Sequence, residues 1–249
     1  MNPPPGDYPL PVIDLGLCKY KPAWDRQLEI HDEVLRGISP HGAIILVEHP
    51  PVITFGRRPG SADHLLVDAA ALDARGIEVV QSDRGGDITF HGPGQLVAYP
   101  IIPLQRYHLG LLEYMRLLEN AIIAAIEPFG ISGCRDVCAT GVWVQDKPAV
   151  VAAEEPTNTG SCGVDISALK KICAIGVKLR RWISLHGVAL NVTTDLAYFD
   201  LINPCGLSRP VTSMQKLLGS ACPPMAAVKA SVAEQLQKHL DAQRQAEGP

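Results

Sequence analysis

The sequence predicts an α/β protein of the α+β type, with a mixed β-sheet flanked by helices. Apolar residues make up 47% of the 249-residue chain, which is enough for a sizeable core, and charged residues make up only 19%, a share typical of folded proteins. Helical and strand-like segments alternate irregularly, and some predicted strands follow one another as in hairpins, so no regular βαβ repeat is expected. The length fits one domain over residues 1–249.

The elements of the first half follow from periodicity and from turn residues. Trp24, Leu28, His31 and Leu35 share one face of a predicted helix that ends at Gly37. Residues 42–48 form an apolar run typical of a buried strand. The next expected elements are a short helix at 67–75, a strand at 77–81 and a strand at 95–102. Pro100 in the last of these indicates an edge position or a strand end.

The second half begins with the strongest helical pattern, at residues 111–129. Its inward positions are Leu111, Met115, Leu118, Ile122 and Ile126. Strands are expected at 140–144, 172–179 and 182–192. A final helix carries the apolar stripe Met225, Val228, Val232, Leu236 and Leu240. An excursion at about 146–170, rich in small and polar residues, separates two of these strands, and loops of this length are usually functional or mobile.

Composition also narrows the class of protein. The formal net charge is −4 and no basic face is visible, so no nucleic-acid partner is expected. No apolar run approaches the ~20 residues of a membrane-spanning helix, and residues 1–8 resemble no targeting segment. A cytoplasmic protein without a membrane partner is therefore expected.

The seven cysteines are an odd number without an evident paired framework, which fits a reducing compartment. A zinc site built from Cys134, Cys138, Cys162 and Cys173 is conceivable. Their spacing matches no standard zinc pattern, so no metal site is expected.

Residues 84–95, with the sequence Arg-Gly-Gly-Asp-Ile-Thr-Phe-His-Gly-Pro-Gly-Gln, hold four glycines in twelve positions. Glycines allow the backbone to approach a ligand closely. Arg84 and His91 add polar side chains that could contact the same ligand. A tight hairpin with ordinary turn glycines is the alternative explanation. The segment is not a nucleotide-binding loop, because neither G-x-G-x-x-G nor G-x-x-x-x-G-K-[ST] occurs in it.

Three further positions are candidates for chemistry. Lys171 begins an apolar strand, where most lysines are merely solvated strand ends. His186 and Gly187 lie inside another strand, and a glycine there often marks close approach by a ligand or a second backbone; for the His186 side chain a satisfied core position is the simpler interpretation. Cys205 lies in a Pro-Cys-Gly turn, where a thiol is exposed enough to react.

Together these segments resemble the lipoyl(octanoyl) transferases, the octanoyl-carrier-protein:protein acyltransferases of lipoate synthesis. The matching strings, in the order of that family, are Leu46-Val-Glu-His-Pro-Pro-Val52 with 54–57, then 84–95, 171–176, 186–191, Pro204-Cys-Gly206 and Val211-Thr-Ser213. The separation of Lys171 and Cys205 along the chain also agrees with the family pattern. The excursion before Lys171 departs from it, since many members have a short turn there. Lys170 is adjacent, and Lys171 is chosen for its spacing to Ala174-Ile-Gly176.

The resemblance implies a fold similar to the catalytic domain of biotin and lipoate protein ligases. It implies an octanoyl thioester on Cys205, with Lys171 lowering the pKa of that thiol. Substrate contacts are implied for Arg84, Gly85, Gly86, Asp87, Ile88, Thr89, Phe90, His91, Ala174, Ile175, Gly176, Gly187, Val188 and Ala189. The implied donor is octanoyl-acyl carrier protein. The implied acceptors are the lipoyl domains of 2-oxoacid dehydrogenase complexes and the glycine cleavage H protein, and no cofactor is implied.

The chemistry suits these residues, because a thioester donor is already activated and transfer to an amine is downhill without a nucleotide. Three rival functions remain open at this stage. An ATP-dependent lipoate or biotin ligase would need a phosphate-facing loop and would not need Cys205. A non-catalytic binding protein would be expected to lack Lys171 or Cys205. A cysteine hydrolase would use His91 or His186 as its base.

Overall fold

The computed structural model describes residues 9–136, 139–145, 168–203 and 209–245. A seven-stranded sheet has the order β1-β2-β6-β10-β9-β8-β7, and a three-stranded sheet has the order β4-β3-β5. The strands of the large sheet are β1 (Val12–Leu17), β2 (Ala43–Glu48), β6 (Gln95–Ile101), β7 (Cys134–Arg135), β8 (Val142–Val144), β9 (Lys170–Arg180) and β10 (Ile183–Asn191). Those of the small sheet are β3 (Val52–Phe55), β4 (Glu78–Gln81) and β5 (Thr89–His91).

Both sheets are mixed. In the large sheet β1 pairs with β2 in parallel and the other neighbours pair antiparallel. In the small sheet β3 pairs with β4 in parallel and with β5 antiparallel. The helices are α1 (Tyr20–Leu35), α2 (Ala69–Asp73), α3 (Leu111–Ile126), α4 (Met214–Leu218) and α5 (Met225–Gln245). The predicted fold class is confirmed.

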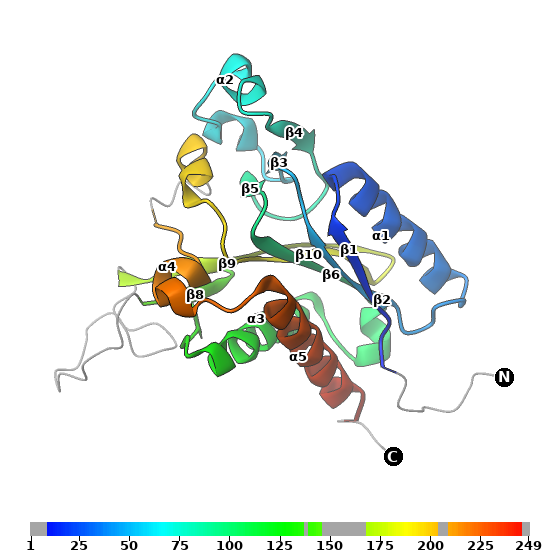
Figure 1. Ribbon diagram of the computed structural model, residues 1–249. Coiled ribbons are helices and arrows are strands. Elements are labelled where there is room, and N and C mark those ends of the chain that lie inside the picture. Colours follow the sequence, from blue (N-terminus) through cyan, green and yellow to red (C-terminus); the bar gives the residue numbers. More distant parts are fainter. Residues whose placement is uncertain (1–8, 137–138, 146–167, 204–208, 246–249) are drawn as a thin grey trace.

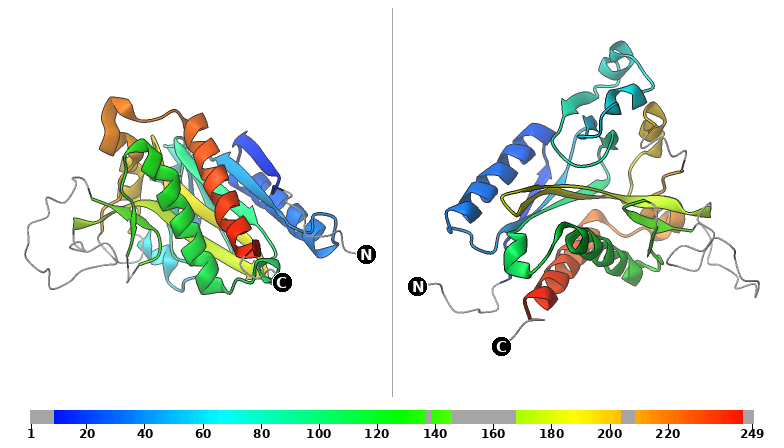
Figure 2. Two further views of the ribbon diagram at one scale, coloured as in Figure 1. Left: turned by 90° about the horizontal axis from the view of Figure 1, so that it is seen from below. Right: turned by 180° about the vertical axis from the view of Figure 1, so that it is seen from behind.

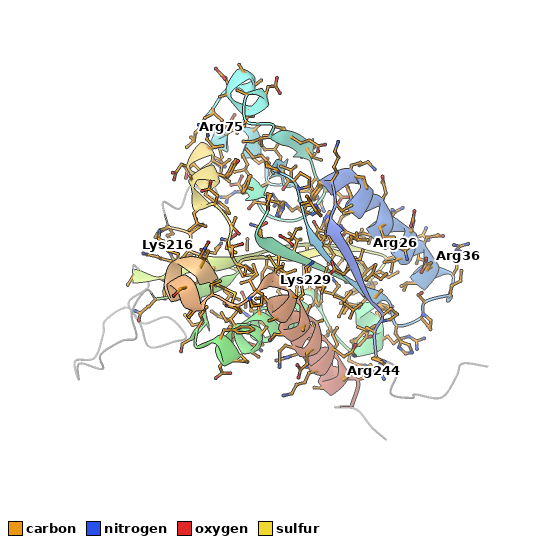
Figure 3. The ribbon with its side chains drawn as sticks, viewed as in Figure 1. Arg26, Arg36, Arg75, Lys216, Lys229 and Arg244 are labelled. Carbon is orange, nitrogen blue, oxygen red and sulfur yellow. The ribbon has the colours of Figure 1, made fainter. Side chains whose placement is uncertain are left out.

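Helices cover both faces of the large sheet (Figures 1 and 2). Successive residues of a strand face opposite sides of a sheet. Ile44 and Leu46 of β2 therefore pack with α3 and α5, whereas Ala43, Ile45 and Val47 pack with α1. Side chains fill the space between these layers (Figure 3). The apolar stripe predicted for the last helix is confirmed, because Val228, Val232, Leu236 and Leu240 are all buried in the core with α3.

The small sheet lies beside α2 and a 3-10 helix at Leu196–Leu201, which share a core with it (Figure 1). Phe90 of β5 stacks on Tyr198 of that 3-10 helix with ring centroids 4.6 Å apart. The segment between β4 and β5 contains the Arg84-Gly-Gly-Asp-Ile sequence. This loop of the small sheet contacts the large sheet, because the N–H of Gly85 donates to the carbonyl oxygen of Val177 on β9.

The predicted face of the first helix is buried only in part. His31 is buried and Leu28 packs against the core, whereas Leu35 is 40% exposed. Ala23, Gln27 and Ile30 are also buried. Gln27 is buried because its side-chain oxygen accepts a hydrogen bond of 2.8 Å from the backbone N–H of His186. A pattern of apolar residues alone does not reveal such a polar contact.

Of the two positions predicted for Pro100, the strand end is confirmed, because Pro100 is the last residue but one of β6. The edge position is not, because β6 lies between β2 and β10 in the middle of the sheet. Gly187 on β10 provides the space for its ring, because a Cβ at Gly187 would lie 2.9 Å from the Pro100 Cδ. In the part of the chain that the structure describes, no helix is long and apolar enough to cross a membrane.

Candidate active site

Lys171 lies on β9, opposite Trp143 of β8 in the strand register. Its ammonium nitrogen is 4.6 Å from the centroid of the Trp143 ring. Gly141 leaves room for the lysine side chain, since a Cβ there would be 3.3 Å from the Lys171 Cε. The strand register and the glycine at 141 therefore place the Lys171 side chain against the Trp143 ring.

The chain on both sides of residues 204–208 is held by backbone hydrogen bonds. After them, the N–H of Lys171 donates to the carbonyl oxygen of Pro210 (3.0 Å) and the N–H of Thr212 donates to that of Lys171 (2.9 Å). Before them, the N–H of Asn203 donates to the carbonyl oxygen of His64 (2.8 Å). Cys205 itself lies outside the described residues. The segment that follows it is bonded directly to Lys171.

A cavity of about 650 Å³ opens beside Lys171. Eleven of the predicted site residues line it: Arg84, Gly85, Gly86, Asp87, Ile88, Thr89, Lys171, Ala174, Ile175, Gly176 and Ala189. The sequence reasoning missed other lining residues, including Arg58, Leu111, Met115, Trp143, Asn191 and Arg209. Leu111 and Met115 were assigned to the core on helical spacing, although Leu111 is 50% exposed.

The glycine-rich loop forms one wall of this cavity by packing against the backbone of β9. The N–H of Gly85 donates to the carbonyl oxygen of Val177 (2.9 Å). A Cβ on Gly85 would lie 2.9 Å from that oxygen, and a Cβ on Gly176 would lie 2.9 Å from the Gly85 oxygen. Contacts this short exclude side chains, so both glycines are required for the loop to meet the strand.

Arg84 holds the loop in place. The arginine is buried, and its guanidinium donates to the backbone oxygen of Thr54 (2.7 Å), to the hydroxyl of Thr54 (3.0 and 3.1 Å) and to the backbone oxygen of Gly85 (3.0 Å). These hydrogen bonds join the loop to β3. Arg84 shapes the cavity wall through these bonds.

Asp87 places a buried carboxylate on the same wall. It accepts hydrogen bonds from the backbone N–H of Ile88 (2.7 Å) and from the Nδ1 of His64 (2.9 Å). The Arg58 guanidinium lies 3.6 Å from it. This cluster joins the loop to His64, whose carbonyl oxygen accepts a hydrogen bond from Asn203, two residues before Cys205 in the sequence.

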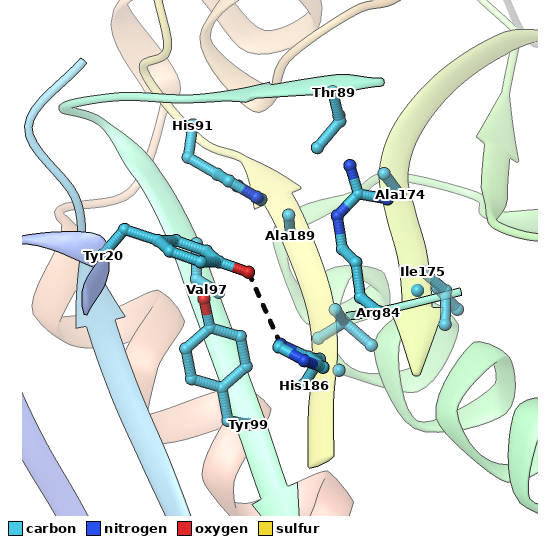
Figure 4. A pocket seen from close by; sticks show the side chains of 13 residues that line it. Tyr20, Arg84, Thr89, His91, Val97, Tyr99, Ala174, Ile175, His186 and Ala189 are labelled. Atoms are coloured by element: carbon cyan, nitrogen blue, oxygen red, sulfur yellow. Dashed lines mark hydrogen bonds between the residues drawn. The ribbon is translucent and has the colours of Figure 1, made fainter. Parts of the chain in front are cut away.

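A smaller cavity of about 50 Å³ shares Arg84, Thr89, Ala189 and the Ala174–Gly176 segment with the larger one. Tyr20, Tyr99, His91 and His186 line its far end (Figure 4). The predicted residues Gly187 and Val188 line this smaller cavity as well. Phe90 lines neither cavity and belongs to the core of the small sheet.

Both candidate histidines are buried and hydrogen-bonded. His91 donates from Nδ1 to the side-chain oxygen of Gln95 (2.7 Å), and burial holds its pKa well below 6.5. His186 donates from Nε2 to Asp83 (2.7 Å), and burial lowers its pKa although Asp83 raises it. The simpler interpretation of His186 is confirmed. Neither ring lines the cavity beside Lys171.

Three of the described cysteines, Cys134, Cys173 and Cys222, are poor candidates for a nucleophile. Burial raises the pKa of Cys173 to about 12, and it also raises the pKa of Cys222. Cys134 is disulfide-bonded, which the sequence did not predict. Among the residues described here, no group of three or more His, Cys, Asp or Glu side chains could hold a metal ion; Cys138 and Cys162 lie outside them.

Comparison with known families agrees with this geometry. The family model of the lipoyl protein ligase A/B catalytic domain matches residues 19–237. The chain belongs to this family. Within it, the chain is 41% identical to a protein named octanoyltransferase from Bacteroides fragilis, with 90% of this chain and 95% of that protein covered. It is 44% identical to another octanoyltransferase, from Chloroflexus aurantiacus, with 85% and 86% covered.

Solved structures of ligases share the fold of this family member. A putative lipoate protein ligase from T. acidophilum superimposes with a TM-score of 0.63 at 14% identity, covering 94% of this chain and 86% of that one. A biotin protein ligase from Aquifex aeolicus in complex with biotin and ATP gives 0.53 at 12% identity, covering 95% and 73%. The predicted similarity to biotin and lipoate protein ligases is confirmed at the level of fold.

Proposed function

We propose that this protein is an acyltransferase that moves an octanoyl group from octanoyl-acyl carrier protein to a lysine of a lipoyl domain, by way of a thioester on Cys205. The proposal rests on one observation above all. Lys171 lies on the wall of a large cavity, and the segment that follows Cys205 is hydrogen-bonded to its backbone. The named octanoyltransferases among the relatives support the same acyl group.

The first half-reaction requires a thiolate. A free cysteine has a pKa of ~8.5 and is only slightly ionised near neutral pH. A lysine ammonium close to the sulfur favours the charged form. The thiolate attacks the carbonyl carbon of the donor thioester, and the acyl–enzyme thioester forms. The carrier leaves as a thiolate that takes up a proton from the Lys171 ammonium, which becomes a neutral amine.

In the second half-reaction the neutral amine of the acceptor lysine attacks the acyl–enzyme thioester. An amide forms, the Cys205 sulfur leaves, and the amine proton is released. Lys171, as a neutral amine between the two steps, is suited to accept that proton. Because a thioester already activates the acyl group, neither half-reaction consumes ATP.

The two joined cavities suit an apolar chain. Ala174, Ile175 and Ala189 lie where they meet, and each buried methylene contributes about 0.8 kcal/mol. The lipoyl domains of 2-oxoacid dehydrogenase complexes and the glycine cleavage H protein are the proposed acceptors. We propose a cytoplasmic location for this reaction.

Intact-protein mass spectrometry tests the thioester directly. After incubation with octanoyl carrier protein, the enzyme should gain one octanoyl group that hydroxylamine removes. Cys205→Ala should abolish both the adduct and the transfer, whereas the matched control Cys222→Ala should retain both, because burial raises the pKa of that thiol. Octanoylation of a lipoyl domain by the Cys205→Ala enzyme would show that the mechanism is wrong.

ATP dependence separates this function from the ligase alternative. Transfer from octanoyl carrier protein should proceed at full rate without ATP or magnesium. A strict requirement for ATP, with free octanoate as the preferred donor, would assign the protein to the ligases instead.

A further inference from the structure

Two cationic side chains contact the indole ring of Trp143. The Lys171 ammonium lies 4.6 Å from the ring centroid and the Arg209 guanidinium carbon lies 4.0 Å from it. All three residues line the cavity of about 650 Å³. A cation within about 6 Å of the indole centroid is attracted to the ring face. Neither the family resemblance nor the sequence pattern had singled out Trp143 or Arg209.

The ring itself is fixed in position. Trp143 is 2% exposed, and its indole N–H donates to the carbonyl oxygen of Ala139 (3.0 Å). Its strand neighbour Gly141 donates its N–H to the buried carboxylate of Glu119 on α3 (3.1 Å), and Glu119 also accepts from Arg116 (2.7 Å). The indole is therefore a rigid surface for the lysine.

Arg209 is fixed as well. Its guanidinium forms an ion pair with Asp136, whose side chain is fully buried, while the arginine side chain is 18% exposed. A buried carboxylate needs such a partner, so the arginine is held on the ring and cannot leave without a large cost. Two positive charges are thereby held at one wall of the cavity, with Asp136 behind one of them.

We infer that Trp143 is a positioning residue that holds Lys171 and Arg209 as a pair of cations facing the acyl-transfer site. This inference rests on the proposed function for the identity of the reaction. The ring attracts both cations, and Arg209 disfavours a second charge beside it. The ring holds the Lys171 ammonium in place, and the positive charge of Arg209 makes it easier for that lysine to lose its proton.

The inference makes opposite predictions for the two partners. Removing the ring face in Trp143→Leu takes away attraction for the ammonium, so the pKa of Lys171 should fall. Removing the neighbouring charge in Arg209→Gln should raise it. A purely structural role would not shift the lysine in opposite directions.

The experiment measures the pH dependence of Lys171 labelling by limiting acetic anhydride, with peptide mass spectrometry, alongside the rate of octanoyl transfer. Trp143→Leu should lower kcat roughly five- to thirtyfold with a smaller change in KM, which is the order expected for one cation–π contact. Trp143→Phe should recover part of that loss, because a phenyl ring keeps a π face. Trp182→Leu, at an indole that is 51% exposed, is the matched control and should change neither readout.

Arg209→Gln removes an ion-pair partner of the buried Asp136 carboxylate, which destabilises the fold. The double variant Arg209→Gln with Asp136→Asn removes both charges and should still raise the pKa of Lys171. Equal labelling profiles in wild type, Trp143→Leu and the double variant would overturn the inference. The proposed function is tested separately: if Trp143 proves neutral while Cys205→Ala abolishes transfer, only the positioning role is wrong.

Discussion

Gly187 lies on β10 where the backbone of β6 leaves no room for a Cβ atom. An added Cβ would be 2.2 Å from the backbone oxygen of Ala98 and 2.9 Å from the Pro100 ring. Gly187→Ala should therefore destabilise the protein by about 2 to 3 kcal/mol, since neither backbone nor ring can move easily. Urea denaturation would measure this loss.

Gly130→Ala is the control for that measurement, because its Cβ would meet nothing within 4 Å and only its positive φ of 81° opposes the change. It should cost about 1 to 2 kcal/mol. A Gly187→Ala protein as stable as wild type would contradict the packing of β10 against β6 described above.

Among individual residues, the sequence predicted the glycines of the cavity wall better than the other lining residues. Gly85 and Gly187 were predicted as positions of close approach, and Gly176 as an implied substrate contact; each of the three has a backbone neighbour that excludes a Cβ. Trp143 and Arg209 were missed, because a tryptophan in an apolar strand and an arginine in a loop carry no pattern of their own. Their role depends on strand register and on a buried carboxylate, neither of which a sequence displays.

Among the elements, the excursion between β8 and β9 offers a direct test. Its predicted range, about 146–170, lies mostly outside the described residues, but Val144 and Lys170 are register partners on adjacent antiparallel strands. The strands are therefore already close enough to be joined by a short loop. Replacing residues 147–168 with Gly-Asn should leave acyl-enzyme formation within roughly threefold of wild type, because shortening a loop changes closure entropy little.

The acylation time course, followed by mass spectrometry, provides the measurement for this variant. Circular dichroism should show that it folds. A folded variant that no longer forms the acyl-enzyme would indicate that the excursion contributes to the site.

Long periodic elements were predicted well and short ones unevenly. The stripe of α5 and the run of β2 matched the structure, since each buries one continuous apolar surface. The short elements α2, β4 and β8 fall in predicted ranges. The strands β3 and β5 and the helix α4 were not predicted, because three to five residues give little periodicity. The buried face of α1 differs in part from the predicted one, because the polar residue Gln27 is buried where its side-chain oxygen accepts a hydrogen bond from the backbone of β10.

At the scale of the whole molecule, the site forms where the two sheets meet. The loop before β5 reaches β9 through the bond from Gly85 to Val177, and the segment after Cys205 reaches the same strand through Lys171. These contacts join residues far apart in the chain. The fold class can be predicted from local sequence patterns. The cavity cannot, because it depends on these contacts between residues far apart in the chain.

The same junction contains buried histidines, which make the stability of the whole fold sensitive to acid. His49 donates from Nδ1 to the backbone oxygen of Cys18 (2.6 Å), and its Nε2 accepts from the Tyr99 hydroxyl (2.9 Å). Burial lowers the pKa of His49 from 6.5 to about 4, and burial also lowers the pKa of His91. Below pH 6.5 the unfolded chain binds protons that the folded chain does not, so the free energy of unfolding must decrease.

His49 alone should reduce the free energy of unfolding by about 1.4 kcal/mol per pH unit between pH 6.5 and 4, or about 2 kcal/mol by pH 5. Above pH 6.5 it contributes no slope, because both states are then neutral. Urea denaturation at pH 7.5, 6.0 and 5.0 would measure the effect. His49→Gln should flatten the profile, since Gln can donate to Cys18 and accept from Tyr99 without titrating; an unchanged slope in that variant would exclude His49 as its source.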